Sequence, residues 1–153
     1  MQKTIILLIL FLGFQLNYAQ KSKLNIYTTD IDNFWIAFDS IKKTNDEQKK
    51  LDIIQKLYLD KATSGLKDFI ISREHSAKRH LGNIKKFPKF WASIRPKTEE
   101  IKTYIPKMEK VFRKYHKIYP DFKEPEIYFT IGVLNSGGTT SPNRILIGSE
   151  IAC

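Results

Sequence analysis

Two apolar segments separated by a glycine-containing loop fill residues 126 to 151 and constrain the fold more than any other part of the chain. In residues 127 to 134, apolar side chains fall on both faces of a predicted β-strand, which therefore needs cover on two sides. Residues 144 to 151 predict its partner strand, so the two form a C-terminal β-hairpin. A two-stranded hairpin alone is only marginally stable in water. Either the preceding helices cover it, or the chain is the front part of a longer protein.

The N-terminus has the pattern of a secretory signal peptide. Lys3 supplies a positive charge, residues 5 to 14 form an apolar run too short to span a bilayer, and Ala19 is a small residue at the expected cleavage position. We therefore expect an exported protein, periplasmic or extracellular, in which residues 1–19 are removed. An uncleaved membrane anchor is the less favoured alternative, and we expect no transmembrane anchor after signal removal.

The remaining residues, 20–153, are expected to form a single domain. A hydrophobic fraction of 42% is sufficient for a folded core. The only cysteine is Cys153, so an internal disulfide is excluded and the exported domain must be held together by packing.

Helical spacing of apolar residues predicts three helices between Asp32 and Ile70, the first capped by Asp30 or Asp32 and the second by Asp46. A weakly apolar helix is expected over residues 76–86. Aromatic residues at 87 to 94 form a cluster that is more often part of a core than a ligand-stacking site.

Residues 95–96, Arg-Pro, are expected to end that aromatic segment, and Thr98 to cap the longest helix, residues 99–119. Its apolar residues fall within one arc of roughly 140°, which we expect to be buried, and its cations within an opposite arc. The apolar arc contains Ile101, Tyr104, Ile105, Met108, Val111, Phe112, Tyr115 and Ile118.

The positive charge of the chain is local. Residues 78 to 117 contain 13 Lys plus Arg and three acidic residues, whereas the other residues balance to zero, so a patch rather than a general basicity needs explaining. The candidate polyanion-binding residues are Lys102, Lys107, Lys110, Arg113, Lys114 and Lys117. A solvated face is the commoner explanation of such a pattern. The functional explanation is that these residues bind an acidic membrane surface, an anionic glycan or an acidic protein. Nucleic acid is the least favoured partner because no recognition motif is present.

The histidines do not predict a metal site. His75 and His80 are five residues apart and would point about 140° away from each other on a helix, which does not fit a zinc pair. We expect neutral or surface histidines, no metal ligand and no catalytic residue. In the loop at 135 to 143, Gly137 and Gly138 can expose backbone N–H groups to an anion, but the lysine of a phosphate-binding loop is missing and a strand follows. A long hairpin loop is the default interpretation.

Three stretches carry a resemblance to a known family: residues 29–35 (TDIDNFW), residues 87–96 (FPKFWASIRP), and the C-terminal pattern formed by 127–132, 137–140 and 147–151. From about Asn25 to Ile151 the chain resembles the N-terminal part of a bacterial family of putative zinc-dependent metalloproteases, domain of unknown function 2268, which is distantly similar to a gliding-motility lipoprotein. The resemblance implies a zincin-like fold in which a His-Glu-x-x-His helix follows the hairpin, binds zinc and activates water for hydrolysis. No residue of that motif has a counterpart in this chain.

We therefore expect an α+β fold, mainly helical with a C-terminal β-hairpin, that is the truncated and inactive N-terminal part of a zincin-like protease. The chain itself needs no cofactor, and zinc belongs to a full-length relative. In the full-length form, an extended peptide substrate is expected to lie along the hairpin. The candidate substrate-binding residues are Asn135, Gly137, Gly138, Thr139 and Thr140. The alternative is a complete small secreted binding module that docks on an acidic surface or glycan through its cationic helix.

Overall fold

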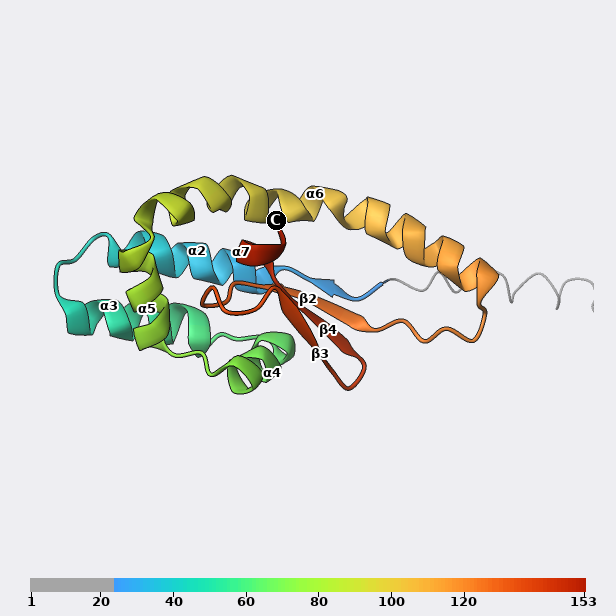
Figure 1. The fold of residues 1–153 in the computed structure, drawn as a ribbon, viewed down its shortest axis with the longest axis horizontal. Coiled ribbons are helices and arrows are strands. Elements are labelled where there is room, and N and C mark those ends of the chain that lie inside the picture. The colour runs from blue at the N-terminus through green and yellow to red at the C-terminus, as the bar shows by residue number, and fades with distance from the viewer. Residues whose placement is uncertain (1–23) are drawn as a thin grey trace, which may run out of the picture.

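The computed structural model describes residues 24–153, and the expected signal peptide lies outside this range. The described chain is a mixed α+β structure, mainly helical (Figure 1). Its helices are α2 (Thr29–Ile41), α3 (Glu47–Ile54), α4 (Ser64–Arg73), α5 (Ala77–Lys86), α6 (Pro88–Ile118) and α7 (Ser149–Ala152), with a π-helical segment (Gln55–Leu59) continuing α3. Its strands are β1 (Ile26–Tyr27), β2 (Glu126–Thr130), β3 (Gly138–Ser141) and β4 (Arg144–Gly148). None of these helices combines the length and the apolar character that crossing a membrane requires.

The expected pairing of the two apolar C-terminal segments is wrong in its direction. β2 and β4 are neighbours in a four-stranded sheet of order β1-β2-β4-β3, but they run parallel, with Ile127 opposite Ile145. β1 also pairs parallel with β2, whereas β3 pairs antiparallel with β4 and forms the hairpin that the chain does contain. The apolar pattern did not indicate β3 because this strand has the polar sequence Gly-Thr-Thr-Ser. Ile151, expected in a strand, lies in the short helix α7.

Helices cover both faces of the sheet, as the apolar pattern predicted for β2. On one face, Ile127 and Phe129 belong to the main core, which is built largely from α2 and α6. On the other, Tyr128 and Leu146 pack with Phe69 of α4. The approach of α4 is so close that a Cβ atom at Gly65 would lie 2.1 Å from Cγ of Tyr128. The preceding helices therefore cover the C-terminal strands.

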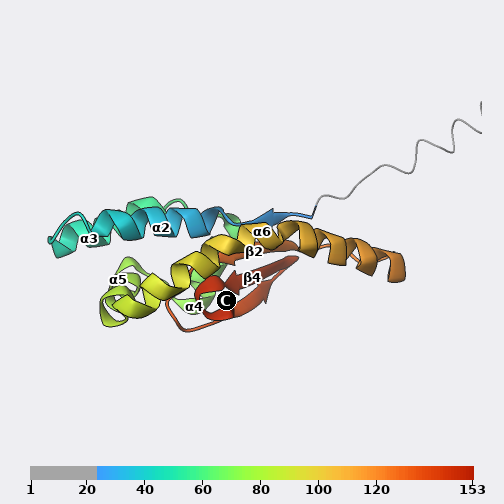
Figure 2. The same ribbon diagram turned by 90° about the horizontal axis from the view of Figure 1, so that it is seen from above.

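The longest helix is one continuous element, so the expected break at Arg95-Pro96 and the expected cap at Thr98 are both wrong. A proline inside a helix removes one backbone hydrogen bond and crowds the preceding turn. Here packing outweighs that cost, because successive turns on both sides of Pro96 bury one stripe of side chains. The stripe consists of Trp91, Ile94, Thr98 and Ile101. Figures 1 and 2 show α6 running alongside α2 and over the sheet.

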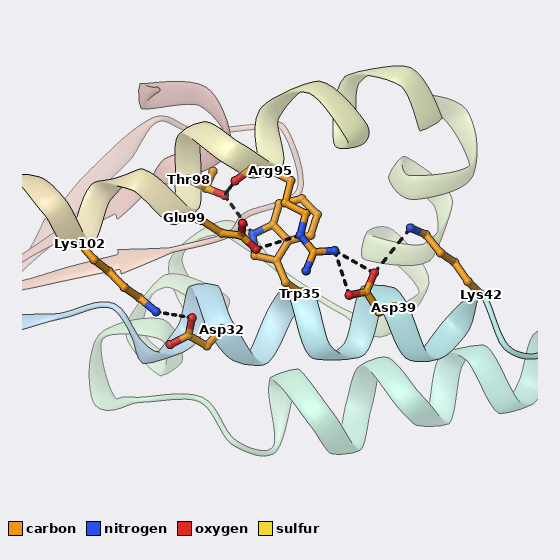
Figure 3. A network of polar contacts seen from close by, with 8 residues as sticks. All are labelled: Asp32, Trp35, Asp39, Lys42, Arg95, Thr98, Glu99 and Lys102. Carbon is orange, nitrogen blue, oxygen red and sulfur yellow. Dashed lines mark hydrogen bonds and ion pairs between the residues drawn. The ribbon is translucent and has the colours of Figure 1, made fainter.

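A polar network fixes α6 to α2 (Figure 3). Trp35 Nε1 donates to Thr98 Oγ1 at 3.0 Å, and Thr98 Oγ1 donates to the carbonyl oxygen of Arg95 at 2.9 Å. The Arg95 guanidinium binds both carboxylate oxygens of Asp39 at 2.9 Å and lies over the Trp35 ring. Both of these hydrogen bonds come from Nη1, and Nε of the same guanidinium donates to Glu99 at 2.8 Å, so Arg95 is held by two charge-assisted contacts. The register of α6 on α2 is therefore set by specific contacts in addition to apolar burial.

The two early aspartates are not helix caps. Thr28 precedes α2 without a capping hydrogen bond, and Asp30 lies buried in the first turn. The Asp30 carboxylate accepts the N–H of Thr63 at 3.1 Å and also its hydroxyl, so it joins the start of α2 to the start of α4. The cap expected at Asp46 is present, since its side chain accepts the N–H of Lys49 at 3.1 Å.

Candidate functional site: the edge strand and its supporting loop

The candidate substrate-binding residues lie at an open edge of the sheet. Asn135 and Gly137 are in the loop that follows β2, and Gly138, Thr139 and Thr140 are in β3. Among the strands that the structure describes, β3 is the outermost and pairs with β4 alone. An edge strand presents backbone N–H and C=O groups on its free side, where another extended chain can pair with them.

The register identifies which backbone groups face outward. Gly148 N–H donates to the carbonyl oxygen of Gly137 at 3.1 Å, so Gly137 faces β4. Residues of an antiparallel pair alternate between facing the partner strand and facing away from it. Thr139 therefore faces β4, and the N–H and C=O of Thr140 face the open side. The Thr140 side chain is also exposed.

Side-chain contacts hold this edge in place. Ser141 Oγ donates to Asp68 Oδ2 of α4 at 2.7 Å. The Arg144 guanidinium binds the same Asp68 oxygen at 2.8 Å and Glu126 Oε2 of β2 at 3.0 Å. Hydrogen bonds from Ser141 and Arg144 lower the pKa of Asp68, and those from Arg144 and Tyr128 lower the pKa of Glu126. The β3–β4 hairpin is thus tied to α4 and to β2.

The loop between β2 and β3 is held by polar groups from distant parts of the chain. The Tyr58 hydroxyl contacts both backbone groups of Ile131. Asn83 Nδ2 donates to the carbonyl oxygen of Val133 at 2.7 Å, and Asn135 Nδ2 donates to the carbonyl oxygen of Arg73 at 3.1 Å. Each contact holds a different residue of the loop, so the backbone leading into β3 has a defined conformation.

Glu150 is the central support of this loop. Its buried carboxylate accepts the N–H of Gly132 at 2.8 Å and the N–H of Leu134 at 3.3 Å. Burial raises the pKa of Glu150, and these backbone hydrogen bonds partly offset the effect. Leu134 has a left-handed φ of 59°, which is strained for a residue with a side chain and costs about 1 kcal/mol or more. A Cβ atom at Gly132 would lie 2.6 Å from Glu150 Oε1, so a larger residue there would displace this carboxylate.

Sequence reasoning did not select Glu150 as a site residue. The available signal was a single acidic residue between small and apolar neighbours in 147–152, a context that suggests burial. The partners of Glu150 are backbone groups, which a side-chain motif does not reveal.

The two nearby histidines are buried side by side, contrary to the expectation that they diverge. His75 lies in the turn between α4 and α5, where Glu74 ends α4 with a left-handed φ of 53°, and His80 lies in α5. Since the two residues do not share a helix, the helical angle does not apply, and their ring centroids are 5.4 Å apart. Both are buried, so of the two expected alternatives, neutral or surface histidines, the surface one does not apply to this pair.

The histidine rings are held neutral by their surroundings. Burial, with the charges of Arg79 and Arg73, lowers the pKa of His75 to about 4, and burial also lowers the pKa of His80. Among the described residues, no ring nitrogen of this pair has a hydrogen-bond partner in good geometry. The neighbouring Asn135 amide directs its N–H to the Arg73 carbonyl instead. The His75 ring packs against Phe69, and the His80 ring packs against Phe34 and Tyr58.

The zinc implied by the resemblance does not fit the residues between 24 and 153. In that range, no group of three or more His, Cys, Asp or Glu residues is arranged to hold a metal ion. His75 and His80 supply two nitrogen ligands at most, and the third histidine, His116, pairs with Glu124 at 3.0 Å. A catalytic zinc site requires three protein ligands and an open position. No catalytic step through zinc follows from these residues.

The candidate polyanion-binding residues divide into two groups. Lys102 pairs with Asp32 at 2.6 Å, and Arg113 lies 3.6 Å from Glu109, so these two cations have protein partners. The remaining four are exposed and form no ion pair within the described part of the chain. They are Lys107, Lys110, Lys114 and Lys117.

The apolar arc of α6 is buried less than predicted. Ile101 is buried, and Ile105, Met108 and Phe112 are half-buried. Tyr104, Val111, Tyr115 and Ile118 are exposed. Figure 1 shows the reason, because the C-terminal half of α6 runs on past α2 and its neighbours.

Comparison of this chain with protein-family models, with curated proteins and with solved structures found no match. Its function is therefore argued from the geometry above and from the resemblance in its sequence.

Proposed function

We propose that the β3 edge binds an extended peptide as an additional strand of the sheet. We further propose that this chain is the peptide-positioning, non-catalytic front part of an exported zinc-dependent protease-like protein. The observation that carries the proposal is the outward-facing backbone of Thr140 on an edge strand whose supporting loop is fixed at several residues. Strand addition to an exposed edge is an established mode of peptide recognition.

In this proposal the chain's own residues bind and orient, and they do not cleave. The N–H and C=O of Thr140 pair with the peptide main chain, so recognition depends little on peptide side chains. Glu150 and Tyr58 hold the loop before β3 in its shape without peptide, which reduces the entropy lost on binding. Cleavage belongs to the His-Glu-x-x-His helix of a full-length form, as the sequence resemblance implies.

A pair of variants at one position tests main-chain recognition. Thr140→Pro removes the outward N–H and is sterically acceptable on an edge strand, whereas Thr140→Val alters only the side chain. Binding to an array of overlapping peptides from unfolded casein should be lost in Thr140→Pro and retained in Thr140→Val. Thermal unfolding checks that both variants are folded. Equal binding by Thr140→Pro and the wild-type chain would contradict strand addition.

The link to a zinc protease is tested separately. The gene should encode a His-Glu-x-x-His motif within about one domain length after codon 153, in one of the three frames. A protein extended through that motif should bind equimolar zinc and cleave casein, and the 153-residue chain should do neither. Absence of the motif would remove the protease assignment and leave the peptide-binding result unaffected.

A further inference from the structure

We infer that the C-terminal half of α6 binds the surface of an anionic lipid bilayer. This inference is independent of the proposed peptide site, and it uses residues on a different part of the fold. It begins from an apolar strip that the protein leaves uncovered. Val111 is 55% exposed, Tyr115 is 52% exposed and Ile118 is 84% exposed. With 100° per residue, these three side chains fall within about 60° of helix circumference.

The strip continues into an apolar groove. Val111 and Tyr115 line a cavity of about 320 Å³ between α6 and β4. Its other lining residues are Phe112, Phe122, Pro125 and Ile145. Large contiguous apolar patches, of more than about a few hundred Å², are rare on soluble monomers and mark interaction sites.

A row of unpaired lysines borders the strip along one side. Lys107, Lys110, Lys114 and Lys117 occupy about 80° of helix circumference directly beside it. All four are exposed and lack an ion pair within the described residues. Residues 110 to 118 include no acidic residue. One solvent-facing side of the helix therefore carries apolar and cationic surface together.

The exposed apolar strip and the lysine row together indicate which kind of partner fits this surface. A glycan would match the lysines but would leave Val111 and Ile118 in water, because it offers little apolar surface. An anionic bilayer matches both features, since lysines reach the phosphates while apolar side chains enter the boundary between headgroups and acyl chains. Lysine stems and the Tyr115 ring, polar at one end and apolar along their length, suit that boundary.

Vesicle flotation with matched variants tests the inference. The wild-type chain should float with vesicles of phosphatidylcholine containing phosphatidylglycerol, and much less with phosphatidylcholine alone. Charge reversal of Lys107, Lys110, Lys114 and Lys117 to Glu should weaken binding at least about a hundredfold. The double variant Val111→Ser, Ile118→Ser should weaken it about tenfold without any change of charge.

The matched control reverses four exposed lysines elsewhere, Lys49, Lys56, Lys61 and Lys67, which changes the net charge equally. This control should lose far less affinity than the α6 variant. Far-UV circular dichroism checks that all variants are folded, and residues 1–23 are common to all of them.

Two outcomes would overturn the inference. Equal losses in the two charge-reversed variants would mean that net charge alone drives binding. Unchanged vesicle binding by the Val111→Ser, Ile118→Ser variant, with heparin bound as tightly as vesicles, would mean that the lysines recognise any polyanion.

Discussion

The Tyr58 hydroxyl satisfies both backbone groups of Ile131, since it donates to the carbonyl oxygen and accepts the N–H at 3.1 Å. Tyr58 belongs to the π-helical segment after α3, whereas Ile131 begins the loop before the edge strand. Both residues are fully buried, so neither backbone group can turn to water instead. One hydroxyl therefore joins the helical half of the fold to the candidate site.

Removing that hydroxyl should destabilise the protein. Tyr58→Phe leaves a buried N–H and a buried C=O without partners, which costs about 1–3 kcal/mol of unfolding free energy. Urea unfolding measures the change. Tyr104→Phe is the matched control, because Tyr104 is exposed and its hydroxyl donates to Glu100 on its own helix, and it should change the free energy by less than about 0.5 kcal/mol. Similar losses in the two variants would contradict the assignment.

Two glycine substitutions should act in opposite directions. Gly65→Ala places a Cβ atom 2.1 Å from Tyr128 Cγ, so α4 must move off the sheet, at a cost of about 1–3 kcal/mol. Gly82→Ala meets nothing within 4 Å inside α5 and should stabilise the helix by up to about 1 kcal/mol. Thermal unfolding should therefore give a lower midpoint for the first and a higher one for the second. A stabilised Gly65→Ala variant would show that α4 packs less tightly on Tyr128.

Stability should fall on acidification because of the buried histidines. The pKa of His75 is about 4 in the folded protein and about 6.5 when unfolded, so the unfolded chain binds more protons between these values. The resulting loss begins below about pH 6.5 and reaches about 3 kcal/mol near pH 4. Asp30 and Glu150, whose pKa values are raised by burial, act in the opposite direction.

A variant isolates the histidine contribution. His75→Leu keeps Asp30 and Glu150, so their opposing effect cancels in the comparison with the wild-type chain. Urea unfolding at pH 7 and pH 4.5 should show a smaller loss of stability in the variant. An equal loss of unfolding free energy between pH 7 and pH 4.5 in the two proteins would rule out His75 as a source of acid sensitivity.

The Thr98 hydroxyl should matter far more than an ordinary helix hydroxyl. Thr98→Val leaves the buried Trp35 Nε1–H unpaired and should cost about 1–3 kcal/mol. Thr103→Val removes an exposed hydroxyl that donates to the backbone carbonyl oxygen of Glu100, and it should cost less than about 0.5 kcal/mol. Differential scanning calorimetry gives the comparison. An unperturbed Thr98→Val protein would mean that the Trp35 indole finds another acceptor.

The sequence predicted those parts of the fold that depend on local pattern. The need for cover on both faces of β2 followed from alternation, and the structure places Ile127 and Tyr128 in different clusters as expected. The cap at Asp46 followed from side-chain chemistry within one turn. Such features involve residues that are close in sequence, so a single chain shows them directly.

Features that depend on distant residues were missed. The continuity of α6 through Pro96 depends on burial of Trp91 and Ile94 against other helices, which no local rule contains. His75 and His80 meet because α4 ends before His75 and Ser76 caps the start of α5 between the two histidines, a change of direction that helical angles cannot anticipate. The candidate edge residues lie next to one another in the loop after β2 and in β3, whereas the supports at Tyr58 and Glu150 come from other elements.

The parallel pairing of β1 with β2 has a consequence for biosynthesis. Ile26 pairs with Ile127, so β1 can pair only after most of the chain has been synthesised. At ribosomal rates of about 5–20 residues per second, that interval is on the order of 10 s. During this time α2 also lacks the sheet surface on which it packs. The packing of β1 and α2 is therefore completed only after the C-terminal strands have been synthesised.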